Sequence, residues 1–300
     1  MRGPPPLSAV AATTQRLAVL LAAGVAPPSA WRYLAEFAPG AVVDAVVAGD
    51  SMAITDSILS TAKGMPQLES EAWRGLAAAW SVATRAGAPL APSLRNYAAA
   101  LRELSQVQRD IAVALAAPVS TARVVLALPV IGLLLATVLG FDPWRVLFTT
   151  PAGGAMLAVG AGLVGAAIVW NRRLVASAQP ANATPGIECE LMAIAVAGGG
   201  SLDRAVRLVH ETLVVCDLTV QGELAHVLEL SRRAGVPAAD LLRSEADEQR
   251  RAARAQAQHA AAALSVRLML PLGLCILPAF LVLGVVPLFA SVISSTVGTF

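Results

Sequence analysis

The C-terminal stretch Arg267–Phe300 reads RLMLPLGLCILPAFLVLGVVPLFASVISSTVGTF, and it carries no charged residue after Arg267. Within it, Leu268–Ser291 is almost unbroken Leu, Val, Pro, Ala and Phe, without a polar face. A helix of about 20 apolar residues spans the core of a bilayer, so this segment is long enough to cross with some tilt. The sequence predicts a transmembrane helix at 268–292 and a short external tail at 293–300.

Composition extends this conclusion to the whole chain. Mean hydropathy is positive, and only 14% of the 300 residues are charged, against roughly a quarter in ordinary soluble domains. The net charge is +2, and no region is basic enough to indicate nucleic-acid binding. We therefore expect an all-α, polytopic membrane protein with membrane lipid around it and no nucleic-acid partner.

Two earlier apolar stretches predict two further spans. Val124–Phe141 is uncharged for 18 residues, and Gly153–Trp170 is rich in Gly and Ala, which suits close helix packing in lipid. We assign transmembrane helices to 119–141 and 153–171, joined by a short external loop at 142–152. Proline inside a helix removes a backbone hydrogen bond and crowds the preceding turn. Membrane kinks are accordingly predicted at Pro129, Pro271 and Pro278.

Arginines set the predicted orientation of the three transmembrane helices. They adjoin both polar regions, 1–118 and 172–267, whereas the loop between the first two spans has a single arginine, Arg145. The positive-inside rule then places both polar regions in the cytoplasm and the C-terminus outside. The arginines next to the polar regions are Arg123, Arg172, Arg173 and Arg267.

An internal repeat relates the two polar regions. The segment Ala86–Arg95, AGAPLAPSLR, aligns with Ala234–Arg243, AGVPAADLLR, and Leu17–Glu36 aligns with Met192–Glu211. Such self-similarity indicates a repeated structural unit, and we predict a cytoplasmic helical bundle for each copy. In both, a helix ends at glycine and the next opens at proline. The predicted structural turns are Gly87, Pro89, Gly235 and Pro237.

The first copy is the more degenerate one. Its segment Gly40–Gly64 has poor helical patterning and is predicted to contain a loop. Met1–Ala30 also imitates a cleaved secretory signal, although the repeat favours a bundle helix there. In the second copy we expect Ser201 to cap a helix and Ala238–Leu264 to form one long helix that runs into the last span.

The order bundle, span, outer loop, span, bundle, span resembles the type II secretion system F-family of inner-membrane platform proteins. Three features carry this resemblance. They are the helix–Gly-x-x–helix segments at the start of each copy, with Gly24 and Gly199, the two Ala-Gly-x-Pro turns, and the apolar segment LPLGLCILPAFLVLGVVPL at Leu270–Leu288. It is closest to the tight-adherence (Flp) pilus assembly branch. The resemblance implies a non-enzymatic, multi-pass protein of the bacterial plasma membrane that couples a cytoplasmic secretion ATPase to pilin or pseudopilin assembly. It also implies a homo-oligomer, or a hetero-oligomer with a paralogous platform protein.

The sequence contains no recognisable catalytic, phosphate-binding or metal-binding motif. Gly198–Gly200 lacks the Lys-Ser/Thr of a phosphate-binding loop, and neither the histidines nor the cysteines have metal-ligand or redox spacing. We expect no catalytic residues, no cofactor and no metal. The residues concerned are His210, His226, His259, Cys189, Cys216 and Cys275.

Glu245–Arg254, EADEQRRAAR, is the densest run of charge. Two interpretations stand: a solvated helix face, in which Asp247 and Arg251 pair four residues apart, or a contact for the motor ATPase. Arg232 and Arg233 are a second candidate for that contact, or for anionic lipid. The candidate partner contacts are Arg232, Arg233, Asp247, Glu248, Arg250, Arg251 and Arg254.

Two other classes of function stay open at this point. A membrane transporter or permease subunit is the alternative, but three spans without an intramembrane carboxylate argue against it. A membrane-anchored signalling or catalytic protein lacks any identifiable site residues.

Overall fold

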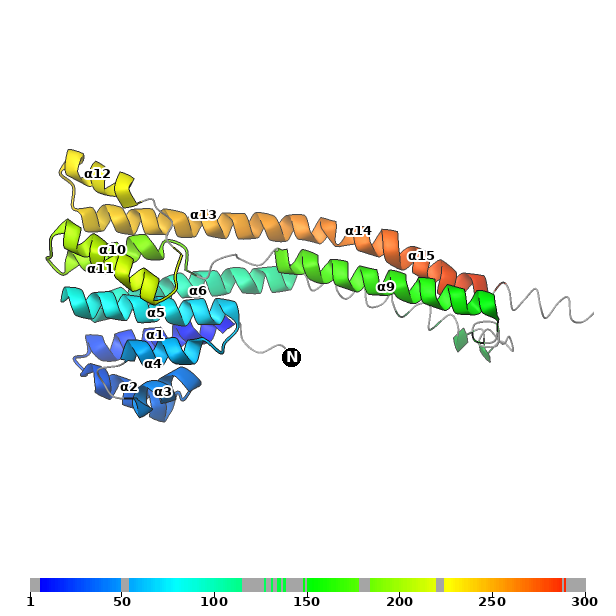
Figure 1. The fold of residues 1–300 in the computed structure, drawn as a ribbon, viewed down its shortest axis with the longest axis horizontal. Coiled ribbons are helices and arrows are strands. Elements are labelled where there is room, and N and C mark those ends of the chain that lie inside the picture. The colour runs from blue at the N-terminus through cyan, green and yellow to red at the C-terminus, as the bar shows by residue number, and fades with distance from the viewer. Residues whose placement is uncertain are drawn as a thin grey trace, which may run out of the picture. The chain divides into compact units, whose positions relative to one another are not determined.

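A computed structural model describes residues 6–49, 54–114, 150–177, 184–219 and 224–287, with residue 289 and isolated positions between 127 and 148. All elements in these ranges are helices, and none of the described residues lies in a strand (Figure 1). Most of the predicted span at 119–141, including Pro129, falls outside the described residues, as do most of the loop at 142–152 and the tail at 293–300.

The chain divides into two compact units. The first combines Met1–Arg109 with Pro180–Gln256, and the second combines Asp110–Gln179 with Ala257–Phe300. Both polar regions thus contribute to the first unit, and their apolar side chains join in one hydrophobic core. Two ion pairs also link the copies, Arg74 with Asp217 at 2.7 Å and Arg85 with Glu211 at 2.9 Å.

Six of the described helices come from the first copy. The segment Gly40–Gly64, predicted to contain a loop, also contains two helices of eight and nine residues that its sequence did not indicate. Each has apolar residues at helical spacing, but over too short a length to stand out as a periodic pattern. The helices are α1 (Pro6–Ala22), α2 (Pro27–Phe37), α3 (Ala41–Ala48), α4 (Ile54–Ala62), α5 (Gln67–Ala86) and α6 (Leu90–Ala114).

Helix α5 lies at the centre of the first unit. It packs against α1 and α4 from its own copy and against the second-copy helices α10 (Ile187–Ala197) and α11 (Leu202–Val215) (Figure 1). Its Trp80 ring lies 5.9 Å from that of Trp31, centroid to centroid. Tyr97 of α6 donates a 2.7 Å hydrogen bond to the carbonyl oxygen of Ala72, and a Cβ at Gly75 would overlap the Tyr97 ring. Helix α1 buries Leu7, Val10 and Leu17 in the same core, as a bundle helix would.

The second copy continues with α12 (Leu224–Ala234) and α13 (Ala238–Arg267). Ser201 caps α11 as predicted, because its hydroxyl accepts a hydrogen bond from the Arg204 N–H. Aligned glycines of the two copies adopt the same left-handed conformation: Gly24 and Gly199 have φ of 84° and 81°, and Gly87 and Gly235 have 72° and 66°. These matched turns support the predicted repeat, although α3 and α4 have no counterpart in the short connection between α11 and α12.

The second unit contains the most apolar helices. By length and composition, Pro151–Leu174 of α9 (Pro151–Ser177) could cross a membrane, and so could the continuous run Ala238–Val285, of which the part from Ala257 onward belongs to this unit. Within the unit α9 packs along the C-terminal run, and a Cβ at Gly160 would overlap Leu283. Large apolar side chains such as Val159 and Leu274 are exposed, which suits helices surrounded by lipid.

The C-terminal run stays helical past its prolines. After α14 (Met269–Pro271), the π-helical segment η2 (Leu272–Ile276) leads to α15 (Leu277–Phe280) and a second π-helical segment, η3 (Leu281–Val285). Proline leaves a carbonyl without its usual i+4 donor, and a π turn re-pairs the backbone with a wider spacing. Pro271 and Pro278 therefore lie next to locally widened turns of a continuing helix.

Candidate partner-binding surface

Helix α12 is amphipathic and presents two arginines to solvent. Val227, Leu228 and Ser231 face inward, and the Ser231 hydroxyl donates a 2.7 Å hydrogen bond to the carbonyl oxygen of Val236. The side chains of Arg232 and Arg233 are 63% and 80% exposed. Both lie in the last turn, where the carbonyl end of the helix dipole favours positive charge.

Part of the charged run on α13 extends this exposed surface. The side chains of Glu248 and Arg251 are both 65% exposed and form a 2.8 Å ion pair. Asp247 pairs with Arg250 at 2.8 Å, so the predicted pairing of Asp247 with Arg251 was wrong. The pairs are three residues apart because the Arg250 side chain turns inward and remains within reach of Asp247.

Arg250 departs from the prediction of a solvated helix face. Its side chain is only 9% exposed, and Nη2 donates a 2.9 Å hydrogen bond to Oε2 of Glu190 on α10, whose side chain is 2% exposed. Arg250 therefore offers no accessible charge to a partner. We call the four accessible residues Arg232, Arg233, Glu248 and Arg251 the α12–α13 surface; Asp247 is also exposed, and Arg254 is half-buried.

Sequence inspection missed Glu190 as a functional candidate. It lies in IECELMAIAVA, a helix that also contains Glu188 and buries every residue from Ile187 to Ala195. A carboxylate in such a helix is costly to bury unless it is paired. The two glutamates in this largely apolar helix were the available signal, because a buried carboxylate such as Glu190 needs a partner elsewhere in the fold.

The predicted turns occur where expected. Gly87 ends α5 with its N–H donating to the carbonyl oxygen of Ala83, and Gly235 ends α12 with its N–H donating to that of Ser231. Pro89 and Pro237 lie immediately before α6 and α13. Each turn positions a long helix directly after a shorter one.

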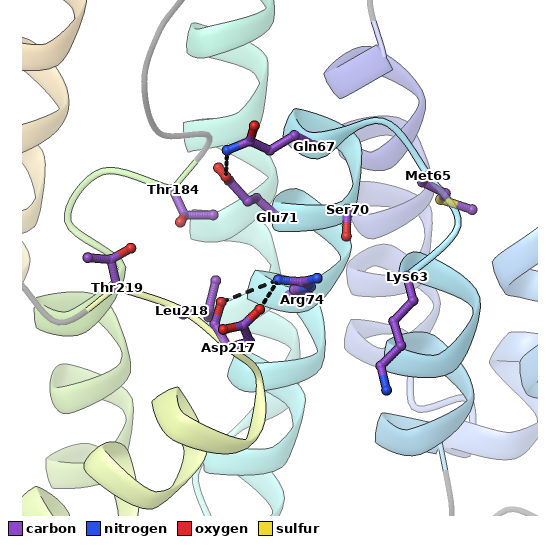
Figure 2. A pocket seen from close by; sticks show the side chains of 10 residues that line it. All are labelled: Lys63, Met65, Gln67, Ser70, Glu71, Arg74, Thr184, Asp217, Leu218 and Thr219. Atoms are coloured by element: carbon purple, nitrogen blue, oxygen red, sulfur yellow. Dashed lines mark hydrogen bonds and ion pairs between the residues drawn. The ribbon is translucent and has the colours of Figure 1, made fainter.

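A cavity of about 400 Å³ opens beside the N-terminal end of α5 (Figure 2). Its walls are polar, and three of its charged side chains have partners: Arg74 binds Asp217, and the Gln67 amide donates to Glu71 at 3.0 Å. The Ser70 hydroxyl is buried without a hydrogen-bond partner among the described residues. The cavity is lined by Lys63, Met65, Gln67, Ser70, Glu71, Arg74, Thr184, Asp217, Leu218 and Thr219.

Two observations on the described part of the chain concern metal and thiol chemistry. There, no group of three or more His, Cys, Asp or Glu side chains could hold a metal ion. Burial raises the pKa of the Cys216 thiol to about 11, although the nearby Arg74 opposes this shift. This thiol is protonated at neutral pH and is a poor nucleophile.

Comparison with known proteins identifies the family. The model of the family described as "Type II secretion system (T2SS), protein F" matches residues 13–138 and 174–286. No curated protein and no solved structure matches the chain. The two matched ranges contain the two copies of the internal repeat and together cover most of the chain. This chain therefore belongs to the type II secretion system protein F family, whose members are inner-membrane proteins.

Proposed function

We propose that the protein is a non-enzymatic platform of a tight-adherence pilus machine, coupling a cytoplasmic secretion ATPase to pilin assembly. The family match over both halves carries this proposal, because the family fits a platform protein of a secretion or pilus machine. The sequence resemblance to the tight-adherence branch supports the narrower assignment. A rigid helical unit with an exposed arginine surface suits protein binding better than catalysis.

The proposed topology has three spans with the first unit in the cytoplasm. The chain leaves this unit after Arg109 and re-enters it at Pro180. Because one folded unit lies on one side of a membrane, the intervening segment crosses an even number of times. With α9 as one crossing, parity needs a second, and 119–141 is the apolar stretch available. The C-terminal run is then the third span.

Cysteine labelling tests this topology. A membrane-impermeant maleimide applied to sealed cells or spheroplasts should label cysteines placed at Thr149 and Thr296. It should reach Phe37→Cys and Val214→Cys, whose native side chains are 78% and 65% exposed, only after permeabilisation. Labelling of Val214→Cys in sealed cells would contradict the proposed orientation. Ser231 is unsuitable as a probe because it is buried.

The α12–α13 surface is the proposed ATPase contact. It combines two arginines at the end of α12 with the Glu248–Arg251 pair on α13. Helix α13 has 30 residues without Gly or Pro, which corresponds to about 45 Å of continuous helix. A force applied near its start would be transmitted along a stiff rod into the C-terminal run.

Co-purification and deletion test the proposed function together. The full-length protein, extracted in detergent, should retain the secretion ATPase encoded with it. Cells that lack the protein should make pilin but display none on their surface, and the wild-type gene should restore display. Normal pilin display in the deletion strain would refute the proposal.

A further inference from the structure

Helix α13 is fixed to the first unit along one face. Leu242, Ala246 and Arg250 recur every fourth residue on this face and are all buried. None of the positions that follow, from Arg251 to Gln256, is fully buried. Arg250 is thus the last buried residue of α13 within the unit, and the attachment of the helix ends there.

Three contacts with the start of α10 accompany this face. A Cβ at Gly186, the residue before α10, would come within 2.7 Å of the Ala246 carbonyl oxygen, so only glycine fits against the α13 backbone. One turn further along α13, Nε2 of Gln249 lies 3.8 Å from Sγ of Cys189. The Arg250–Glu190 ion pair follows directly.

Packing alone defines the position of α13 along its axis only weakly. Within the first unit, Leu242 and Ala246 are the buried apolar side chains of this helix, and small side chains such as alanine make shallow ridges that interlock poorly with a neighbouring helix. A buried ion pair behaves differently, because a displacement of α13 leaves Glu190 buried and unpaired, whereas Arg250 keeps Asp247 on its own helix. Oε1 of Glu190 and Nε of Arg250 are already buried without a hydrogen-bond partner among the described residues.

We propose that Glu190 and Arg250 are positioning residues that set the axial register of α13 against the first unit. Because the ion pair prevents α13 from sliding along its axis relative to the first unit, a displacement of the unit also displaces α13. The register itself is inferred from the contacts between α10 and α13, whereas its role in transmitting movement rests on the proposed function.

A double substitution can remove the ion pair between α10 and α13 without lowering the stability of the fold. Glu190→Leu with Arg250→Met removes both charges and refills the site with apolar side chains of similar size, a change that often preserves stability. Asp247→Asn is the matched control, because Asp247 binds the same guanidinium but belongs to α13 itself. The control removes an ion pair without removing the link between the helices.

Spin labels at two exposed positions of the first unit, Val214 and Ala252, report the register in the full-length protein. In the wild type and in Asp247→Asn the distance distribution should be narrow. In the double variant the distance distribution should shift or broaden by about one helical turn, roughly 5 Å. The melting temperature should stay close to that of the wild type, and pilin display should fall. A narrow distribution with normal display in the double variant would overturn the proposal.

Glu190→Gln replaces the double variant if the latter fails to fold. It should broaden the distances and reduce display, and an unchanged distribution with normal display would equally overturn the proposal. The secretion ATPase should still co-purify with all these variants. Failure of the wild type to retain the ATPase would count against the proposed function alone, because the spin-label distances test the register independently of any motor.

Discussion

Helices α5 and α12 occupy equivalent places in the two copies, each directly before an Ala-Gly-x-Pro turn, yet they are buried very differently. Helix α5 buries 11 of its 20 residues, including Trp73, Leu76 and Trp80. Helix α12 buries three of 11 and ends in two exposed arginines. The difference suggests a division of labour between these two helices, in which α5 supplies core side chains and α12 supplies an accessible surface directly before the long helix α13.

Interrupting α13, the helix that follows α12, should have the largest effect on pilin display. Insertion of two glycines after Ala257 should abolish pilin display, because glycine destabilises a helix interior and uncouples the two parts of the rod. Membrane insertion and the melting temperature of the first unit should be preserved. The matched control inserts two glycines after Gly64, in the exposed turn before α5, and should assemble normally. A stable α13 insertion variant that still displays pilin would show that the helix is a passive connector.

Stability should depend on α5 far more than on α12. Trp80→Ala removes a buried ring and should lower the free energy of unfolding by about 3–5 kcal/mol. Leu230→Ala, at a position 48% exposed on α12, should change it by less than about 0.5 kcal/mol. Thermal melts followed by circular dichroism in detergent provide the comparison. Similar losses in both variants would mean that α12 belongs to the core as much as α5 does.

The two turns should respond alike even though their helices differ. Gly87 and Gly235 both have positive φ, and a Cβ at either would meet nothing within 4 Å. Alanine at either position should therefore cost only the backbone strain, about 1 kcal/mol. Gly64→Ala, at a glycine with neither positive φ nor close neighbours, is the control and should be nearly neutral in the same melts. A much larger cost at one turn would argue against their equivalence.

Local chemistry explains which parts of the fold could be predicted from sequence. The Ser201 cap, the left-handed Gly87 and Gly235, and the long α13 each depend on neighbouring residues alone. The short α3 and α4 were missed because eight or nine residues contain too little periodicity.

The candidate site was harder to predict because it depends on tertiary contacts. The exposure of Arg232 and Arg233 followed from their place at a helix end. The burial of Arg250 did not, because its partner Glu190 lies 60 residues away and only the fold brings them together. The same inward turn of Arg250 changed the partner of Asp247.

Binding of the secretion ATPase to the purified full-length protein tests the central claim most directly. Arg232→Glu with Arg233→Glu reverses the charge of both arginines of α12, and Arg204→Glu with Arg207→Glu makes the same change on the exposed face of α11. The account predicts that the α12 variant weakens binding roughly tenfold or more, about 1.4 kcal/mol, while the α11 variant binds like the wild type. Equal affinity of the wild type and the α12 variant would contradict the assignment of the α12–α13 surface as the motor contact.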